Sequence, residues 1–127
     1  MDTLFMVALI LEALLGVGCM LVPAAILAPF GVKLNEIATP FARLFGSALI
    51  AFSILLWFAR KSDNPGFRNA MAYSMSAYYL ASAVILLITQ IAGLMNALGW
   101  SMVGIHVLLL IWFGYFIVKS RPVLQQR

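Results

Sequence analysis

The sequence predicts an all-α membrane protein in which four transmembrane helices form an antiparallel bundle with both termini in the cytoplasm. Composition is the first observation: of the 127 residues, 65% are hydrophobic and only 9% are charged, which are too few polar groups to cover a soluble domain of this size. Segmentation is the second, because the apolar residues fall into runs long enough to cross about 30 Å of hydrocarbon as helices. Residues 1–127 are therefore expected to form a single transmembrane domain.

Charged or turn-forming residues separate the four predicted spans. The spans cover residues 4–22, 40–60, 69–93 and 97–118. Thr39 and Asn64 are candidate N-caps of the second and third helices, since their side-chain oxygens can accept hydrogen bonds from free backbone N–H groups. Pro40 and Pro65 follow them and suit the first helical position, where the missing N–H costs nothing. The turn GLMNALGW is short, so the last two helices should pack as a hairpin.

The segment after Pro23 allows two interpretations. Its sequence, PAAILAPF, continues the apolar character of the first span, so a kinked helix could run on through it. Alternatively, the first helix stops near Val22 and residues 23–30 form a short helix that lies in the membrane interface. We favour the short interfacial helix, because residues 4–22 already suffice to span the membrane.

The basic residues predict topology rather than a nucleic-acid partner. The formal net charge is +4, but its cations lie singly or in pairs beside the apolar runs, where they set orientation, and form no clustered basic face. The side shared by both termini and the central loop carries Arg60, Lys61, Arg68, Lys119, Arg121 and Arg127. Lys33 and Arg43 fall on the other side. A bacterial cytoplasmic (inner) membrane is the default location, and an organelle membrane is the alternative.

One acid lies inside the first apolar run, LILEALLGVG, and it predicts a polar layer at mid-membrane. A lone carboxylate in hydrocarbon is costly, so Glu12 must take up a proton or find hydrogen-bond donors. At 1.5 Å per residue, Tyr78, Tyr79 and His106 come to nearly the depth of Glu12, with Ser82 one turn away. These five residues are the candidate ligand or proton site.

Two readings of this layer remain open. Glu12 is either a proton or cation site, as intramembrane acids often are, or a structural acid that joins helices or contacts a partner subunit. His106 is either a satisfied hydrogen-bonding group or a ligand-binding one. Haem would need a second axial ligand, and the sequence contains only one histidine.

Small residues at helical spacing predict close helix packing. They recur at intervals of four or eight residues in the first three spans: Ala8 and Gly16, four residues on either side of Glu12, Ala42 and Gly46, and Ala77 and Ala81. Arg43, near the start of the second span, is expected to reach a lipid phosphate or Glu36 at the outer interface. The alternative for Arg43 is an anionic ligand or lipid headgroup held at the outer mouth.

Patterns typical of enzymes and of metal sites are missing from the sequence. No HxxE pair, CxxC, GxSxG, P-loop or dinucleotide-binding glycine pattern occurs, and no two carboxylates are spaced for acid–base work. We therefore expect no catalytic residue, no metal and no dedicated cofactor. A bound lipid or quinone-like molecule is compatible with the methionine- and phenylalanine-rich composition.

Residues FARLFGSALIAFSILLWFAR and NALGW resemble small four-span bacterial inner-membrane proteins of uncharacterised families, in the neighbourhood of the DoxX-like proteins. That resemblance covers most of the chain in layout and implies a four-helix fold, without implying an activity. The segment LILEALLG is also similar to the glutamate-bearing first helix of small multidrug-resistance transporters. The third span and the long first loop depart from the pattern of that second family.

Three functions are compatible with these features. The favoured one is a non-catalytic accessory or scaffold subunit that packs against other membrane proteins or against itself. The second is a small proton-coupled transporter that titrates Glu12. The third is a binding protein for a lipid, a quinone or another hydrophobic molecule, with Tyr78, Tyr79 and His106 as its polar groups.

Overall fold

The computed structural model describes residues 1–124, and within them all regular structure is helical. The elements in chain order are α1 (Asp2–Leu21), α2 (Pro23–Leu27), η1 (Ala28–Phe30), α3 (Ala38–Lys61), α4 (Pro65–Ile91) and α5 (Gly99–Leu124). Four of these, α1, α3, α4 and α5, are long and apolar enough to cross a membrane. The expected all-α class, with four helices of the length and composition of membrane spans, is thereby confirmed.

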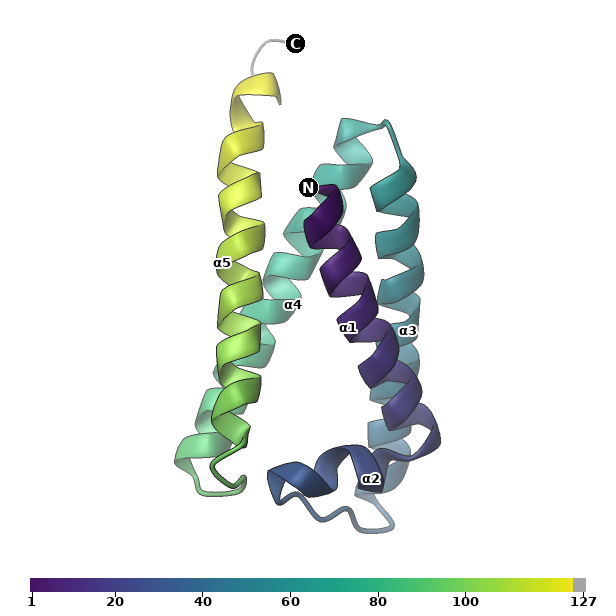
Figure 1. Ribbon diagram of the computed structural model, residues 1–127, viewed down its shortest axis with the longest axis vertical. Helices are drawn as coiled ribbons and strands as arrows, with labels where there is room; N and C mark the ends of the chain where they lie inside the picture. The colour runs from purple at the N-terminus through teal and green to yellow at the C-terminus, as the bar shows by residue number, and fades with distance from the viewer. Residues whose placement is uncertain (125–127) are drawn as a thin grey trace.

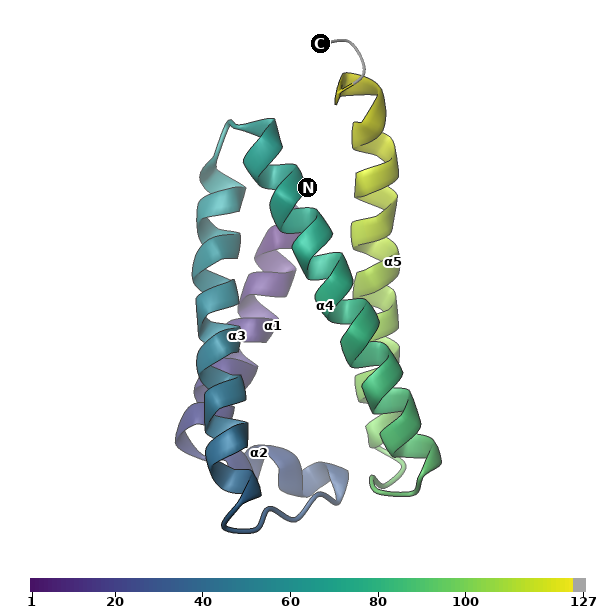
Figure 2. The same ribbon diagram turned by 180° about the vertical axis from the view of Figure 1, so that it is seen from behind.

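The long helices pack as two pairs rather than as one evenly spaced bundle. Helix α1 lies along α3 and α4 lies along α5, with far fewer contacts between the pairs (Figures 1 and 2). The pairs cross near the end where α1 begins and α5 ends, and they diverge toward the other end (Figure 1). There, α2 and η1 lie across the gap (Figure 1).

The hydrophobic core lies where the two pairs cross. It joins residues from all four long helices: Leu4, Phe5, Ala8, Leu56, Ala59, Met71, Ala72, Met75, Tyr79, Leu109, Phe113 and Ile117. Many large apolar side chains on the outer faces of the same helices are exposed. An apolar outer surface of this kind suits contact with lipid chains.

Helices α1 and α3 touch at two glycines. A Cβ atom placed on Gly16 would lie 2.9 Å from the carbonyl oxygen of Gly46, and one placed on Gly46 would lie 2.6 Å from that of Gly16. No other residue type would allow the two backbones to approach so closely. Ala8, two turns before Gly16, is fully buried.

The small residues of α4 behave differently from the expected packing stripe. Ala77 and Ala81 are exposed, while the buried face of α4 carries Met75, Tyr79 and Ala83. Within this chain, therefore, the prediction that Ala77 and Ala81 pack against another helix is wrong. Packing of the larger residues against α1 and α5 turns the alanines outward.

The helix ends confirm one predicted cap and correct another. Asn64 caps α4, because its side-chain oxygen accepts hydrogen bonds from the N–H groups of Gly66 and Phe67, and Pro65 is the first helical residue. The predicted cap at Thr39 is wrong, since α3 begins at Ala38 and Thr39 already lies within it. Asn35 accepts the backbone N–H of Ala38 at 2.8 Å in its place.

After α1 ends at Leu21, Pro23 opens the separate helix α2, as the interfacial-helix interpretation requires. The following η1 turn ends at Gly31, whose φ of 81° is a left-handed conformation that favours glycine. Asn96, in the turn between α4 and α5, holds this segment in place. Its side-chain amide donates to the carbonyl of Pro29 at 2.8 Å, and its backbone N–H donates to the carbonyl of Phe30 at 2.9 Å.

Candidate functional site

Glu12 lies inside the protein, on the face of α1 that points toward α4 and α5. Its side chain is 3% exposed. The Tyr79 hydroxyl donates a hydrogen bond of 2.7 Å to Glu12 Oε1, while the Tyr78 hydroxyl lies 3.5 Å from Oε2, at the limit of a hydrogen bond. One carboxyl oxygen is therefore well satisfied and the other has spare capacity to accept.

His106 faces the same interior from α5. Its Nδ1 atom lies 2.8 Å from the backbone carbonyl oxygen of Met102. Because that oxygen can only accept, Nδ1 carries a proton, which leaves Nε2 as an acceptor when the ring is neutral. The ring meets Tyr79 edge-on, with 5.7 Å between centroids, so Tyr79 contacts both Glu12 and His106.

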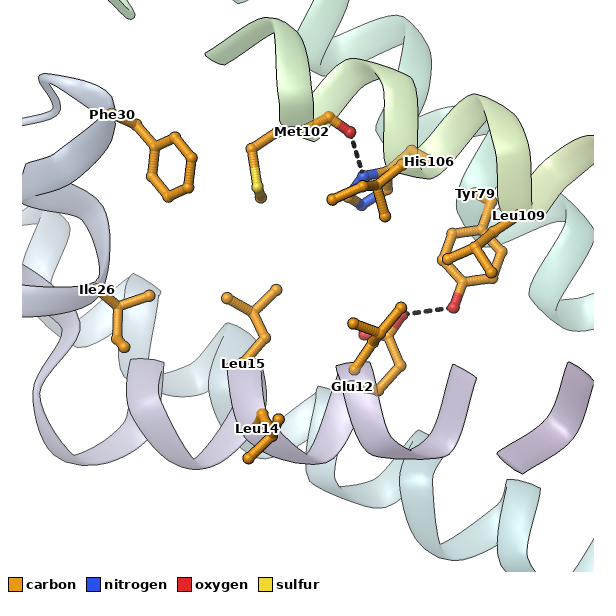
Figure 3. Close-up of a pocket in the computed structure, with 11 residues that line it drawn as sticks. Glu12, Leu14, Leu15, Ile26, Phe30, Tyr79, Met102, His106 and Leu109 are labelled. Atoms are coloured by element: carbon orange, nitrogen blue, oxygen red, sulfur yellow. Dashed lines mark hydrogen bonds between the residues drawn. The ribbon is translucent and has the colours of Figure 1, made fainter. Parts of the chain in front are cut away.

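A cavity of about 360 Å³ opens beside these residues (Figure 3). Figure 3 shows Glu12 and His106 on opposite walls, with the apolar residues between and around them. The lining comes from α1, α2, η1, α4 and α5: Leu11, Glu12, Leu14, Leu15, Ile26, Phe30, Tyr79, Met102, Ile105, His106 and Leu109. Glu12 and His106 thus face a largely apolar space of suitable size for part of a small molecule.

A second cavity, of about 390 Å³, lies on the side of α3 and α4. Its lining is Leu15, Cys19, Leu27, Phe41, Ala42, Phe45, Ser82, Ile85, Leu86, Met102 and His106. Both cavities share Leu15, Met102 and His106, so these three side chains stand between the two spaces. We call the two cavities together the chamber.

The chamber has an exposed apolar rim on each of two sides. Leu14 and Ile105 are exposed between α1 and α5, and Phe41 and Ile85 are exposed between α3 and α4. Both rims belong to helices that are apolar enough to cross a membrane. The chamber therefore opens sideways, through rims of exposed apolar side chains.

An apolar groove continues from the α1–α5 side of the chamber. It is lined by Leu11, Ile105, Leu108, Leu109, Ile111, Trp112 and Tyr115 and has a volume of about 590 Å³. Leu11, Ile105 and Leu109 line both the groove and the first cavity. From Met102 in the chamber to Tyr115 the path along α5 is about 20 Å at 1.5 Å per residue.

The side chains that line the chamber and the groove include one acidic residue, Glu12, and no lysine or arginine. Arg43 lies outside, in a shallow depression beside the junction of α1 and α2 that Thr39 and Pro23 also line. Among the described residues, it makes no salt bridge with Glu36. No group of three metal-ligating side chains occurs in the described part of the chain.

The structure brings together most of the residues that the sequence singled out. Glu12, Tyr79 and His106 share the first cavity, and Ser82 lies in the wall of the second. Tyr78 contacts both Tyr79 and His106 through its ring. Ala42 lines the second cavity, so it borders an open space rather than a tight helix contact.

Sequence reasoning missed the part of the site that closes one end. Ile26 and Phe30 line the first cavity, and Leu27 lines the second. Asn96 positions this segment from the turn between α4 and α5. The only sequence signal for this arrangement was the asparagine and the glycine of NALGW, which indicate a turn. They give no information about which segment the turn contacts.

Comparisons with protein-family models, curated proteins and solved structures find no match to this chain. The resemblance to DoxX-like proteins therefore stays a prediction, and the function must be argued from the geometry of the chain itself.

Proposed function

We propose that this multi-pass membrane protein binds a long-chain hydrophobic molecule, such as a lipid or a quinone-like molecule, in the chamber between its two helix pairs. The observation that carries the proposal is the pair of cavities that meet at Leu15, Met102 and His106. Glu12 and Tyr79 supply a hydrogen-bonded polar end to an otherwise apolar interior. Apolar walls with a few placed polar groups are typical of small-molecule sites.

The groove along α5 supports a molecule with a long chain. Groove and chamber together extend about 20 Å along the helix, which exceeds half of a hydrocarbon core of about 30 Å. A scaffold subunit needs no such interior, because its contacts lie on its outer faces. The accessory-subunit hypothesis, with other membrane proteins or a second copy of the chain as partner, stays a prediction. The exposed Ala77 and Ala81 would provide a small-residue surface for such a helix contact.

In this proposal the four long helices cross a bacterial inner membrane in alternating directions, and both termini are cytoplasmic. The positive residues Arg60, Lys61 and Arg68 at the α3–α4 loop support that orientation. The start of α1 and the end of α5 lie toward the same end of the molecule as this loop (Figure 1). A fluorescent-protein fusion at the C-terminus, which folds only in the cytoplasm, tests the orientation by its fluorescence.

The binding proposal is tested by extracting the protein from its native membrane in polymer-bounded bilayer discs and analysing the particles by native mass spectrometry. We expect a bound amphiphile that survives removal of bulk lipid. Leu15→Trp fills the space where the cavities meet and should remove most of the bound molecule. Val17→Trp places the same ring on the exposed face of α1, where it lines no cavity, and is the matched control.

Equal retention by Leu15→Trp and Val17→Trp would contradict binding in the chamber. Circular dichroism and particle homogeneity establish that both variants keep their helices. Met102→Trp provides a second blocking variant from the opposite wall, so that the conclusion does not depend on one substitution. A wild-type protein that carries no amphiphile and takes none up from added lipid would also contradict the proposal.

The transporter hypothesis makes a different prediction for the same acid. Reconstituted Glu12→Gln protein would lose coupled proton movement if Glu12 were titrated during transport, which a pH-sensitive dye inside liposomes measures. A binding protein or scaffold would move no protons in either form. This measurement separates transport from binding without identifying the bound molecule.

A further inference from the structure

Two acceptor atoms in the chamber carry no strong hydrogen bond. Glu12 Oε2 has only the long contact of 3.5 Å to the Tyr78 hydroxyl. Nε2 of the neutral His106 ring has no protein partner among the described residues, because the ring is anchored through Nδ1. The two side chains belong to α1 and α5 and face each other across the first cavity (Figure 3).

Few of the groups around these atoms can satisfy them, because the Tyr78 hydroxyl reaches Glu12 Oε2 only at 3.5 Å and Ser82 lines the second cavity rather than the first. Apart from Tyr79, whose hydroxyl is committed to Oε1 of Glu12, the first cavity is lined by leucine, isoleucine, methionine and phenylalanine. A buried acceptor that lacks a donor is unfavourable, and an incoming hydrogen-bond donor relieves that cost. The site is therefore complementary to a molecule that brings a donor of its own.

The absence of lysine and arginine from the lining restricts the head group of that molecule. A phosphate or carboxylate in the chamber would have no permanent cation to pair with and would lie near the carboxyl group of Glu12. A protonated amine could pair with Glu12, but the desolvation of a buried ion pair offsets most of its attraction. A hydroxyl carries no charge, and its O–H can donate to either of the two free acceptors.

We propose that the chamber selects a single-chain amphiphile with an uncharged hydroxyl head, which donates its O–H to Glu12 or His106 while its chain occupies the groove along α5. This inference rests on the proposed binding function and adds the chemical class of the ligand. The head would lie in the first cavity, and the chain would leave past Leu11 and Ile105, which line both spaces.

Four probes with the same sixteen-carbon chain test this selectivity: hexadecanol, hexadecyl methyl ether, hexadecylamine and hexadecanoic acid. Each pair competes at equal mole fraction in phosphatidylcholine nanodiscs that contain the protein, and native mass spectrometry gives the ratio bound. We expect the alcohol to exceed the ether about twofold to tenfold, the value of one net hydrogen bond. The amine and the acid should both bind more weakly than the alcohol.

Two variants locate the selectivity. Glu12→Leu removes both carboxyl oxygens and His106→Phe removes Nε2, and each keeps a side chain of similar size. The double variant should therefore lower the alcohol-to-ether ratio, although the Tyr79 hydroxyl that Glu12→Leu releases stays in the cavity. Met102→Leu is the matched control, since Met102 lines both cavities and its side chain makes no hydrogen bond. The control should keep the wild-type ratio.

The outcomes separate this inference from the binding function that it deepens. Equal binding of all four probes, or preference for the amine or the acid, would overturn the hydroxyl head and leave chamber binding intact. Failure of every probe to bind, together with no effect of Leu15→Trp, would overturn both. The wild-type ratios alone decide the head group, even if the double variant does not fold.

Discussion

The hydroxyl of Tyr79 on α4 donates a hydrogen bond of 2.7 Å to the carboxyl group of Glu12 on α1, and this bond links the two helix pairs at the edge of the chamber. Both side chains are almost completely buried, at 1% and 3% exposure. Because this hydrogen bond joins two buried groups from different helix pairs, it affects both the stability of the protein and the shape of the chamber.

Tyr79→Phe should destabilise the protein by about 1–3 kcal/mol, because it leaves Glu12 Oε1 buried without its donor. The free energy of unfolding, measured by denaturant titration in mixed micelles, checks this value. Tyr73→Phe removes a hydroxyl from an exposed position on the same helix and should cost much less. Equal losses of unfolding free energy in the two variants would show that the hydrogen bond from Tyr79 to Glu12 makes no specific contribution to stability.

The contact between α1 and α3 depends on two glycines that have no room for a side chain. Gly16→Val should cost about 1–3 kcal/mol, since its Cβ would lie 2.9 Å from the Gly46 carbonyl oxygen and force the helices apart. Gly104→Ala and Gly114→Ala are the controls, because a Cβ at either position meets nothing within 4 Å. The controls should be neutral or stabilise slightly, as alanine is the better helix former. The same unfolding titration compares them.

Asn96→Asp tests how the α2–η1 segment is held. The substitution keeps the side-chain oxygen that accepts the Leu98 N–H but removes the amide that donates to the Pro29 carbonyl. We expect hydrogen exchange of the Gly31 and Val32 amides to accelerate about fivefold, the value of one hydrogen bond.

Asn64→Asp is the matched control for this exchange measurement. At that position the side chain acts on the α4 backbone only as an acceptor, a role that a carboxylate keeps. Exchange at the start of α4 should stay unchanged or become slower, because a negative charge is favourable at a helix N-terminus. Unchanged exchange at Gly31 in Asn96→Asp would mean that the backbone bond to Phe30 holds the segment alone.

Arg68 should matter more for stability than its partner Asp2. The two form a salt bridge, but Asp2 is largely exposed and such pairs contribute less than about 1 kcal/mol. Arg68 additionally approaches the Ser62 carbonyl oxygen and covers the ring of Phe5, with 5.6 Å between its guanidinium carbon and the ring centroid. Arg68→Ala should therefore destabilise the protein more than Asp2→Asn in unfolding titrations. A larger loss of stability in Asp2→Asn than in Arg68→Ala would contradict this prediction.

The length and composition of the apolar runs were sufficient to predict the number of spans, because no other structure satisfies the backbone of such runs in lipid. Counting 1.5 Å per residue also placed Glu12 and Tyr79 at one depth, and in the structure their side chains meet. Depth alone did not show that Tyr79 rather than Tyr78 makes the short bond, because that choice depends on how α4 rotates about its axis.

The rotation of α4 and the divergence of the pairs could not be read from the sequence. Ala77 and Ala81 have the spacing of a packing stripe, yet lipid and protein surroundings are equally apolar, so hydropathy does not tell an outward face from an inward one. The chamber arises from helix crossing angles and from the return of Ile26 and Phe30 over its end. Neither of these features has a local sequence pattern.

The position of α2 and η1 gives the chamber a direction along the helix bundle. Ile26 and Phe30 close it at the end where α2 and η1 lie, whereas Glu12 lies about 15 Å along α1, near the middle of that helix. The two cavities thus occupy the half of the bundle away from the start of α1, and the groove along α5 continues past Leu109 into the other half. If the four long helices cross a bilayer as proposed, the side openings of the chamber face the chains of one leaflet, and the tail of a bound molecule extends along the groove toward the other.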